Sequence, residues 1–322
     1  MLEFKELTLE DRPWADRILK SENSRSADFN FGNMYMWLKK YPQRVARFDE
    51  RLLIHNCGAV PCFSFPVGLG PLRPALDAII EYAADFGEEF CMLGLTEEQR
   101  AAVEAEFPGK FAFRENRFFA DYIYSAEKLA TYSGHALHGK RNHCNRFEAE
   151  HEWKFVPLTR ALIPDCADML KKWNDENADR LDADIAYEYD AIARGFAAYE
   201  QLGLEGGVLI ADGEIMGFSV GEMTCGDTLD VHFEKAFADF DGAYSMVCRE
   251  MARMMLAKHP ELKYLNREED MDNESLRFSK MSYKPEFLLT KYDARCKNER
   301  CGNTCVPHGG GAGTYTAVDG GF

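Results

Sequence analysis

Carboxylates and a histidine alternate with apolar residues in the segment 228–237, and this pattern suits acid–base chemistry. The alternation predicts a strand with one apolar face and one polar face. The polar face carries Asp230, His232 and Glu234, and the strand expected before this one can bring Glu222 beside them. Transfer of an acyl group to an amine or hydroxyl needs a base that accepts the proton of the nucleophile. These four residues are therefore candidate catalytic groups, and the alternative is a solvated sheet face.

A second group of carboxylates follows the strand expected at 264–266. Glu268, Glu269 and Asp270 come directly after the end of that strand, where the sites of α/β proteins often lie. These residues can be functional, or they can form a loop that caps the helix expected at 275–281. The pattern alone leaves both interpretations open.

Positive charge is concentrated in the segment 135–147, which carries three fixed positive charges and no acidic residue. On a helix these cations would lie along one side and could hold phosphates of tRNA, of a phospholipid headgroup or of CoA. The candidate binding residues are Lys140, Arg141, His143 and Arg146. The alternative is pairing within the chain, because three glutamates follow directly within 148–152.

The composition limits the class of protein. The chain has 322 residues, which corresponds to about two domains of ordinary size. Hydrophobic residues make up 46% of it and can fill a substantial core, so a disordered chain is excluded. The 38 basic and 54 acidic residues give a net charge of −16, which opposes nonspecific binding to nucleic acid or anionic lipid. Any polyanion must therefore meet a local basic patch.

The sequence predicts a cytoplasmic protein without a membrane span. The first residues lack the basic and apolar regions of a secretory signal. The uncharged stretch 52–72 is long enough to raise the question of a span. Its three prolines and three glycines would break a helix exposed to lipid, so we expect short strands and turns there.

The end of the chain combines thiols, an imidazole and glycines. Three thiolates and an imidazole can complete a tetrahedral zinc site, and the weak candidates are Cys296, Cys301, Cys305 and His308. Their spacing matches no standard zinc pattern, and the Gly-rich run 309–313 is typical of a flexible segment. We therefore predict a flexible tail and no metal site.

The expected elements begin in the same order twice. A strand precedes a helix at 11–21, and a strand at 153–159 precedes a helix at 161–173. Two similar halves joined by the basic segment are therefore expected. The predicted parts are a domain at 1–134, a bridging helix at 135–152, a domain at 153–293 and the tail at 294–322.

Strand pairing can be predicted at two places. The Asp-Gly pair at 212–213 lies between two apolar runs and predicts a hairpin, with the strand 228–237 pairing next to it. The aromatic-rich segment 111–124 is interpreted as a pair of strands within the first half.

Four stretches of the sequence resemble those of one family. They are Phe-Pro-Gly-Lys-Phe at 107–111, Asp-Tyr-Ile-Tyr-Ser-Ala-Glu-Lys-Leu-Ala at 121–130, Gly-Lys-Arg-Asn-His-Cys-Asn-Arg-Phe at 139–147 and Asn-Arg-Glu-Glu-Asp at 266–270. The order of elements in the second half, with its short helix at 273–283, resembles that of GNAT acyltransferases. The chain thus resembles the doubled-GNAT family related to the C-terminal domain of phosphatidylglycerol lysyltransferases, in the GNAT and Fem-like acyltransferase superfamily.

The resemblance covers roughly residues 1–292 and implies a fold and a reaction class. The fold class is α/β (α+β), a tandem GNAT-like acyl-CoA N-acyltransferase fold with two mixed sheets flanked by helices. The reaction is transfer of an acyl or aminoacyl group to an amine or hydroxyl of a small molecule or lipid headgroup. Because the string 266–270 matches the family, Glu268 joins the catalytic candidates. The alternative is a non-catalytic GNAT-like module that binds a phosphorylated ligand.

The donor expected from the resemblance is acyl-CoA or aminoacyl-tRNA, and no other cofactor is predicted. In the GNAT fold a loop and a helix N-terminus bind the pyrophosphate of CoA, and Gly242 and Ala243 occupy that place here. Asp239 and Asp241 in the same loop would repel a pyrophosphate, which favours aminoacyl-tRNA. Phe278 stands where many GNAT enzymes have a tyrosine acid, so another proton donor would be required.

Overall fold

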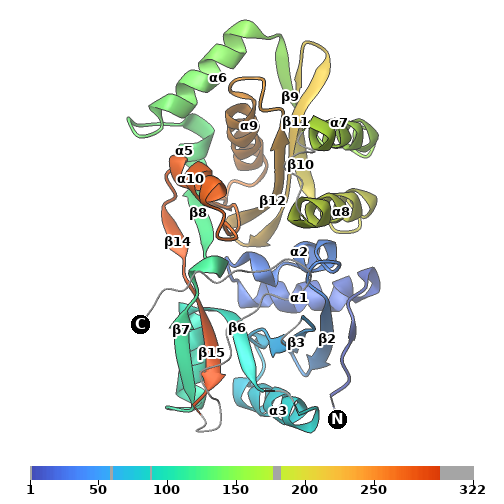
Figure 1. Cartoon of the computed structure of the whole chain (residues 1–322), viewed down its shortest axis with the longest axis vertical. Helices are drawn as coiled ribbons and strands as arrows, with labels where there is room; N and C mark the ends of the chain where they lie inside the picture. The colour runs from blue at the N-terminus through green and yellow to red at the C-terminus, as the bar shows by residue number, and fades with distance from the viewer. Residues whose placement is uncertain (1, 59–60, 88, 177–182, 298–322) are drawn as a thin grey trace.

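Two mixed sheets lie one above the other along the long axis of the molecule (Figure 1). The computed structural model describes residues 2–58, 61–87, 89–176 and 183–297. Within this part of the chain, each sheet is flanked by helices, as the sequence predicts.

The first sheet has eight strands and contains one parallel pair, β4 with β6. Its order is β1 (Lys5–Glu6), β2 (Gln43–Phe48), β3 (Arg51–Asn56), β4 (Cys62–Phe63), β6 (Cys91–Thr96), β15 (Lys291–Cys296) and β7 (Phe111–Glu115), with β5 (Val67–Gly68) paired to β3. The α-helices of this half are α1 (Arg12–Glu22), α2 (Phe31–Met36), α3 (Leu72–Asp85) and α4 (Glu97–Glu106). The described residues of the uncharged stretch 52–72 include most of β3 and all of β4 and β5, which confirms the short strands predicted there. Among the described residues, no helix combines the length and apolarity needed to cross a membrane.

The second sheet has seven strands and likewise contains one parallel pair, β12 with β13. Its order is β14 (Phe287–Leu289), β8 (Asp121–Ser125), β13 (Tyr264–Asn266), β12 (Thr228–Ala236), β11 (Glu214–Cys225), β10 (Glu205–Ala211) and β9 (Trp153–Pro157). Its helices are α5 (Ala126–Thr131), α6 (His138–Glu150), α7 (Ile163–Glu176), α8 (Ala183–Ala197), α9 (Ala243–Lys258) and α10 (Glu274–Ser282). Three short 3-10 helices complete the described elements: η1 (Leu9–Asp11), η2 (Ala27–Phe29) and η3 (Arg117–Phe119).

The hairpin predicted at the Asp-Gly pair is confirmed. Asp212 and Gly213 have positive φ angles of 53° and 85°, which the preferred two-residue hairpin turn requires. β12 then pairs antiparallel with β11, and this register sets Glu222 directly opposite Asp230. The turn chemistry and the strand alternation together therefore place two of the candidate residues side by side.

The pairing predicted within 111–124 is wrong, because the two halves exchange strands. β7 and β8 belong to different sheets. In the first sheet β15 lies between β6 and β7, and in the second sheet β8 lies between β13 and β14 (Figure 1). Each sheet thus contains one strand contributed by the other half of the chain, inserted at the corresponding position between two of its own strands. Sheet membership therefore does not follow the boundaries predicted near residues 134 and 293.

The two faces of the second sheet belong to different cores. Val208 and Phe218 pack with the first half and with α7 and α8. Leu209 and Met216 pack with α9, α5 and α6 on the opposite face. The first core is continuous across both halves, so the first half is packed against the second sheet rather than tethered to it.

Candidate functional site

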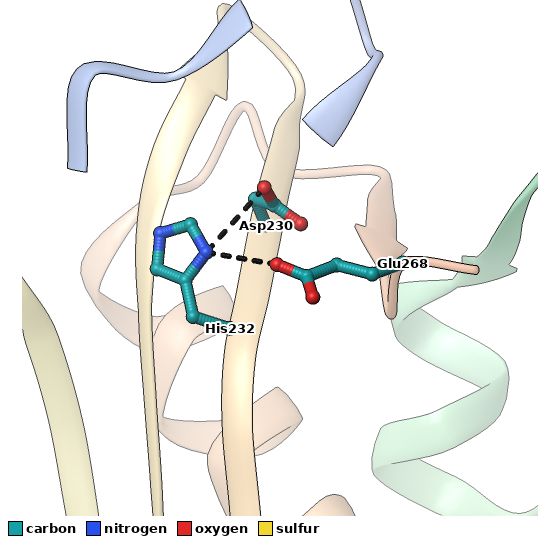
Figure 2. A group of neighbouring side chains, drawn as sticks. All are labelled: Asp230, His232 and Glu268. Atoms are coloured by element: carbon teal, nitrogen blue, oxygen red, sulfur yellow. Dashed lines mark hydrogen bonds and ion pairs between the residues drawn. The ribbon is translucent and has the colours of Figure 1, made fainter. Parts of the chain in front are cut away.

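His232 lies at the centre of a group of three carboxylates, and Figure 2 shows it with two of them, Asp230 and Glu268. Its Nε2 atom is 3.1 Å from Glu222 Oε1, and its Nδ1 atom is 3.1 Å from Glu268 Oε1 and 3.6 Å from Asp230 Oδ2. Asp230 and His232 are two residues apart on β12, so both point to the same face. The structure thus brings together four of the five predicted catalytic residues, and we call them the His232 cluster.

The His232 cluster is almost entirely removed from water. The side chains of Asp230 and His232 are 0% exposed, and that of Glu268 is 15% exposed. Burial alone would lower the pKa of His232, but the surrounding carboxylates, Asp230 foremost, raise that pKa well above its ordinary value. Burial raises the pKa of Asp230. Glu268 is the member of the cluster through which a ligand can enter.

The first half of the chain supplies the groups that orient these carboxylates. Asn30 Nδ2 donates to Asp230 Oδ2 at 2.6 Å, and Asn33 Nδ2 donates to Glu268 Oε1 at 3.1 Å. Gly32 lies between them on α2, and a Cβ atom there would be 2.2 Å from Glu222 Oε1. No sequence pattern points to these three residues, because about 200 positions separate them from their partners and neither spacing nor periodicity connects such distant segments.

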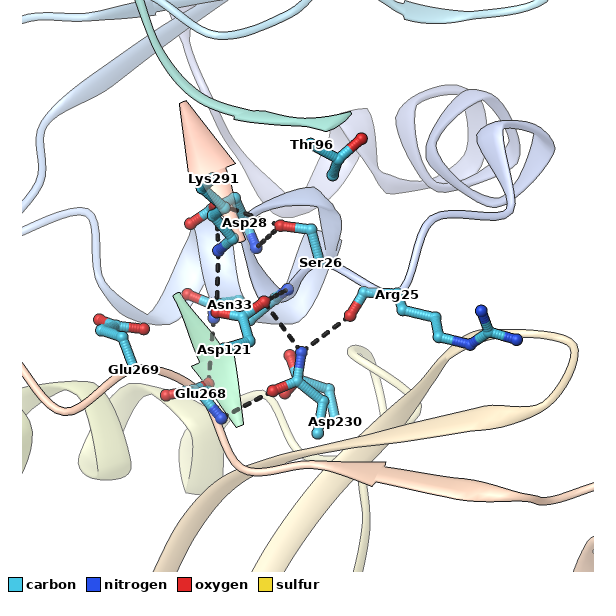
Figure 3. Close-up of polar contacts among 12 residues, drawn as sticks. Arg25, Ser26, Asp28, Asn33, Thr96, Asp121, Asp230, Glu268, Glu269 and Lys291 are labelled. Atoms are coloured by element: carbon cyan, nitrogen blue, oxygen red, sulfur yellow. Dashed lines mark hydrogen bonds and ion pairs between the residues drawn. The ribbon is translucent and has the colours of Figure 1, made fainter. Parts of the chain in front are cut away.

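A second buried network lies beside the cluster and ties the halves together (Figure 3). Lys291 Nζ donates to Asp28 Oδ2 at 2.7 Å and to Asp121 Oδ1 at 2.8 Å. The other oxygen of Asp121 accepts from the Ala27 backbone and from Asn266 Nδ2, each at 3.0 Å. Burial raises the pKa of Asp121, although the charge of Lys291 opposes this rise. Burial would lower the pKa of Lys291, but the carboxylates of Asp121 and Asp28 raise it. This network fixes the position of η2 next to the cluster.

The backbone of the loop after β13 is held by Lys280 of α10. Lys280 Nζ donates to the carbonyl oxygens of Arg267, Glu268 and Glu269, at 2.5, 3.2 and 2.5 Å. Glu268 itself has a positive φ of 55°, which a residue other than glycine rarely adopts. The three hydrogen bonds therefore stabilise the loop conformation that directs Glu268 toward His232.

Glu234, the fifth predicted catalytic residue, lies outside the His232 cluster. Its Oε1 atom is 2.8 Å from Arg267 Nη2. Arg267 also lies over the ring of Tyr283, 4.5 Å from its centroid. Burial raises the pKa of Glu234, while Arg267 opposes that rise. This pair belongs to a separate polar group under α10.

The four cations predicted on the basic helix point to different partners. Lys140 Nζ lies 3.8 Å from the centroid of the Tyr283 ring, and Arg141 donates to the backbone carbonyl of Tyr132 at 2.5 Å. His143 Nδ1 and Arg146 Nη1 contact the carboxylate of Asp241, at 2.6 and 2.8 Å. Pairing within the chain thus occurs, with Asp241 and, for Arg146 Nε, also with Glu150 Oε1 at 3.2 Å, one of the glutamates that follow the segment.

α6 covers the helix N-terminus at which the sequence places a phosphate site. Gly242 precedes α9 with a φ of 94°, and a Cβ atom there would be 2.5 Å from the backbone oxygen of His143. Ala243, the first residue of α9, is fully buried. The two residues predicted to bind a cofactor therefore lie beneath α6.

The remaining predicted residues lie away from the cluster or beyond the described chain. Cys296 ends β15, whereas Cys301, Cys305 and His308 lie outside the described residues. Phe278 is 78% exposed on α10. Its side chain therefore faces outward from the fold.

Comparison with known proteins decides the family. Residues 20–295 match the family described as phosphatidylglycerol lysyltransferase, C-terminal. The chain belongs to this family. The resemblance inferred from the sequence motifs is thereby confirmed, and with it the tandem GNAT-like fold.

Two solved structures share the fold of this family member over most of its length. One, a conserved protein of unknown function from Bacteroides thetaiotaomicron, is 36% identical with a TM-score of 0.86, covering 92% of this chain and 100% of that one. The other is the C-terminal domain of a putative lysylphosphatidylglycerol synthetase from Agrobacterium fabrum, 14% identical with a TM-score of 0.61, covering 89% and 91%. An uncharacterized protein of Mycoplasmoides gallisepticum is 25% identical over 177 residues, which span 53% of this chain and 54% of that relative. The family and its neighbours give this chain an aminoacyltransferase-like GNAT fold.

Proposed function

We propose that this protein is an aminoacyltransferase that moves an aminoacyl group from aminoacyl-tRNA to a hydroxyl or amine acceptor. The observation that carries the proposal is the His232 cluster, in which a partly exposed carboxylate is hydrogen-bonded to a buried imidazole. Membership of the phosphatidylglycerol lysyltransferase family supports the reaction class.

In the proposed reaction, Glu268 accepts the proton of the acceptor as its oxygen or nitrogen attacks the ester carbonyl of the donor. The ester bond to the tRNA ribose then breaks, and the proton held by Glu268 passes to the departing ribose oxygen. His232 holds the Glu268 carboxylate in place through the 3.1 Å contact to Oε1. A positioned acid–base group of this kind contributes typically 10²- to 10⁴-fold in rate.

The donor is proposed to be aminoacyl-tRNA rather than acyl-CoA. The pyrophosphate of CoA would have to approach the N-terminus of α9, which the backbone of α6 covers at Gly242. The loop before α9 also carries Asp239 and Asp241, whose charges repel a pyrophosphate. tRNA can instead meet the outer side of α6, where His143 and Arg146 are 50% and 57% exposed.

The acceptor is proposed to be a hydroxyl of a lipid headgroup, with phosphatidylglycerol as the first compound to test. The family description names this lipid, and transfer to a glycerol hydroxyl fits a site with one accessible carboxylate. Small-molecule amines are the second class of acceptor.

The test supplies purified protein with labelled aminoacyl-tRNAs, and in parallel with acyl-CoA, in the presence of phosphatidylglycerol vesicles or pooled amines. We expect label from aminoacyl-tRNA to enter the lipid, and Glu268→Gln to slow the transfer by about 10²-fold or more. Glu205→Gln is the matched control, because Glu205 also contacts a histidine, His259, at 3.0 Å but lies outside the cluster. Absence of transfer from any donor would refute the proposal that this protein is an enzyme. Retained saturable binding of tRNA would then favour the non-catalytic module.

A further inference from the structure

We propose that Asp230, His232 and Glu268 bind one divalent metal ion. The inference goes beyond transfer chemistry, since binding of the ion requires neither donor nor acceptor. Any part that the ion has in catalysis rests on the proposed function.

The spacing of the three side chains matches that of metal ligands. One ligand atom from each residue can be chosen so that all lie within 4.8 Å of one another. His232 Nδ1 is 3.1 Å from Glu268 Oε1 and 3.6 Å from Asp230 Oδ2. Ligand atoms at about 2.0–2.2 Å from a four-coordinate ion are themselves roughly 3.3 Å apart. The two distances from His232 thus fit such an ion, and the carboxylates of Asp230 and Glu268 would have to close in on it from within 4.8 Å of each other.

Asp230 supplies an independent sign of a missing ligand. Its Oδ2 atom accepts from Asn30 and faces His232, whereas its Oδ1 atom is buried and has no hydrogen-bond partner among the described residues, so only a cation that also reaches Oδ1 satisfies this oxygen. A buried carboxylate oxygen without a partner is costly, because it loses its hydration without compensation. Figure 2 shows this carboxylate beside the imidazole and Glu268. A cation bound at this carboxylate would satisfy the atom.

The groups around the three ligands resemble the outer shell of a metal site. His232 Nε2 contacts Glu222 Oε1 at 3.1 Å, which leaves Nδ1 as the nitrogen that faces the other two carboxylates. A metal-bound histidine generally donates its second N–H to a carboxylate or carbonyl in this way. Asn30 and Asn33 each donate to one of the other two carboxylates and orient them.

Charge and access also favour a divalent cation. Three carboxylates surround one imidazole, and an ion that replaces the Nδ1 proton of His232 leaves that imidazole neutral, so the carboxylates balance the charge of a divalent cation. One imidazole with two carboxylates suits first-row ions such as Mn²⁺, Fe²⁺ or Zn²⁺. Since Glu268 is 15% exposed, an ion can reach the site from the surface. A lipid or tRNA could then place an oxygen on the open position of the ion.

The experiment titrates the full-length protein, freed of metal with a chelator, with Mn²⁺ by calorimetry and by electron paramagnetic resonance. Mn²⁺ is the probe because thiols, including those at 301 and 305, bind it poorly compared with softer ions. We expect one saturable Mn²⁺ site per chain. Asp230→Asn and His232→Gln should each weaken it at least 10-fold, and Glu222→Gln should weaken it about 10- to 100-fold as a residue that orients a ligand.

His259→Gln is the matched control, because His259 also contacts a carboxylate, Glu205, at 3.0 Å and should leave the affinity unchanged. Thermal melting checks that each variant folds, and Glu268→Gln at the partly exposed position replaces Asp230→Asn if that variant does not. Absence of saturable binding of Mn²⁺ and of Zn²⁺ to the wild-type chain would overturn the proposal. Unchanged affinity in the folded Asp230 and His232 variants would also overturn it.

The metal site and the transfer reaction can fail separately. Saturable metal binding without transfer from any donor would leave the site established and refute the proposed function. Transfer by protein that binds no metal would support the proposed function and refute the metal site.

Discussion

At the scale of single residues, the His232 cluster depends on the close approach of the Glu222 side chain on β11 to the backbone of α2 at Gly32. Glu222 is directed at α2, and the carboxylate oxygen that meets His232 is also the atom that lies nearest to Gly32. A side chain of any size at position 32 would occupy the space of that oxygen. Gly32 is therefore required by the packing of the first half on the cluster and not by an unusual backbone angle.

Gly32→Ala should destabilise the protein by about 1–3 kcal/mol, because the added methyl group overpacks a buried position. Transfer activity and metal binding should fall with it, since Glu222 would lose its place beside His232. Urea unfolding measures the stability. Gly139→Ala is the control, because a Cβ atom there meets nothing within 4 Å in α6 and alanine favours a helix. Equal stability of the two variants would contradict this role for Gly32.

At the scale of elements, α10 acts on the site through one buried ammonium group. Lys280 reaches three successive carbonyl oxygens of the loop after β13, and this loop carries Glu268. Burial lowers the pKa of Lys280, an effect that Glu269 and Glu268 oppose. α10 is thus a support for the loop, whereas its exposed Phe278 contributes nothing to the cluster.

Lys280→Met should lower the free energy of unfolding by about 2–3 kcal/mol, because buried carbonyl oxygens lose a charged donor. Transfer activity should also fall, even at a temperature where the variant is folded, since Glu268 is no longer held at its strained backbone angle. Lys284→Met, on the exposed residue that follows the helix, should change stability by less than about 0.5 kcal/mol. A folded Lys280 variant with full transfer activity would argue against the positioning role.

The basic helix α6 offers a second prediction at this scale. Asp241 contacts both His143 and Arg146, and Arg146 also pairs with Glu150, so Asp241→Asn should remove one negative charge from the outer face of α6 and leave Arg146 with a single carboxylate partner. We expect tRNA affinity to rise a few-fold and its salt dependence to steepen, because more phosphate contacts release more counterions. Asp239→Asn is the control, since it changes the net charge equally in the same loop. Equal affinities of the two variants would show that α6 does not contact the donor.

The sequence could predict elements whose cause is local. The Asp212–Gly213 turn fixes a hairpin, the alternation in β12 fixes its faces, and their register brings Glu222 to Asp230. The residues Asn30 and Lys291 could not be found in this way, because their partners lie 200 and 170 positions away. The strand exchange could not be predicted for the same reason, because nothing in the sequence of a short strand such as β8 or β15 identifies the sheet that it joins.

At the scale of the whole molecule, the halves are joined by charges as well as by the shared core. Arg25 of the first half donates to both oxygens of Asp227 in the turn after β11, at 3.1 and 2.7 Å. Burial would raise the pKa of Asp227, but hydrogen bonds from Arg25 and Thr228 bring that pKa below its usual value. The ionised carboxyl is therefore more favoured in the folded chain than in the unfolded chain.

This direction fixes the pH dependence of the contact. A carboxyl with a lowered pKa stabilises the fold above its unfolded pKa of about 4, and this contribution is lost as the pH falls through the folded value. Asp227→Asn should cost about 1 kcal/mol at pH 7, and the difference from wild type should shrink below about pH 4. Urea unfolding at pH 7 and pH 3.5 measures both values. A difference that grows in acid would contradict the assigned sign.

The exchange of β8 and β15 makes each half incomplete without the other. β15 is the partner of both β6 and β7, so its loss leaves two strands of the first sheet without a neighbour at that place. A chain ending at residue 290 should therefore unfold its first half at a much lower urea concentration than the full chain. A chain ending at residue 297 keeps every described strand and should unfold like the full chain. If both truncated chains unfold at the same urea concentration as the full chain, the exchanged strand contributes little to stability, and each half would then be expected to fold by itself.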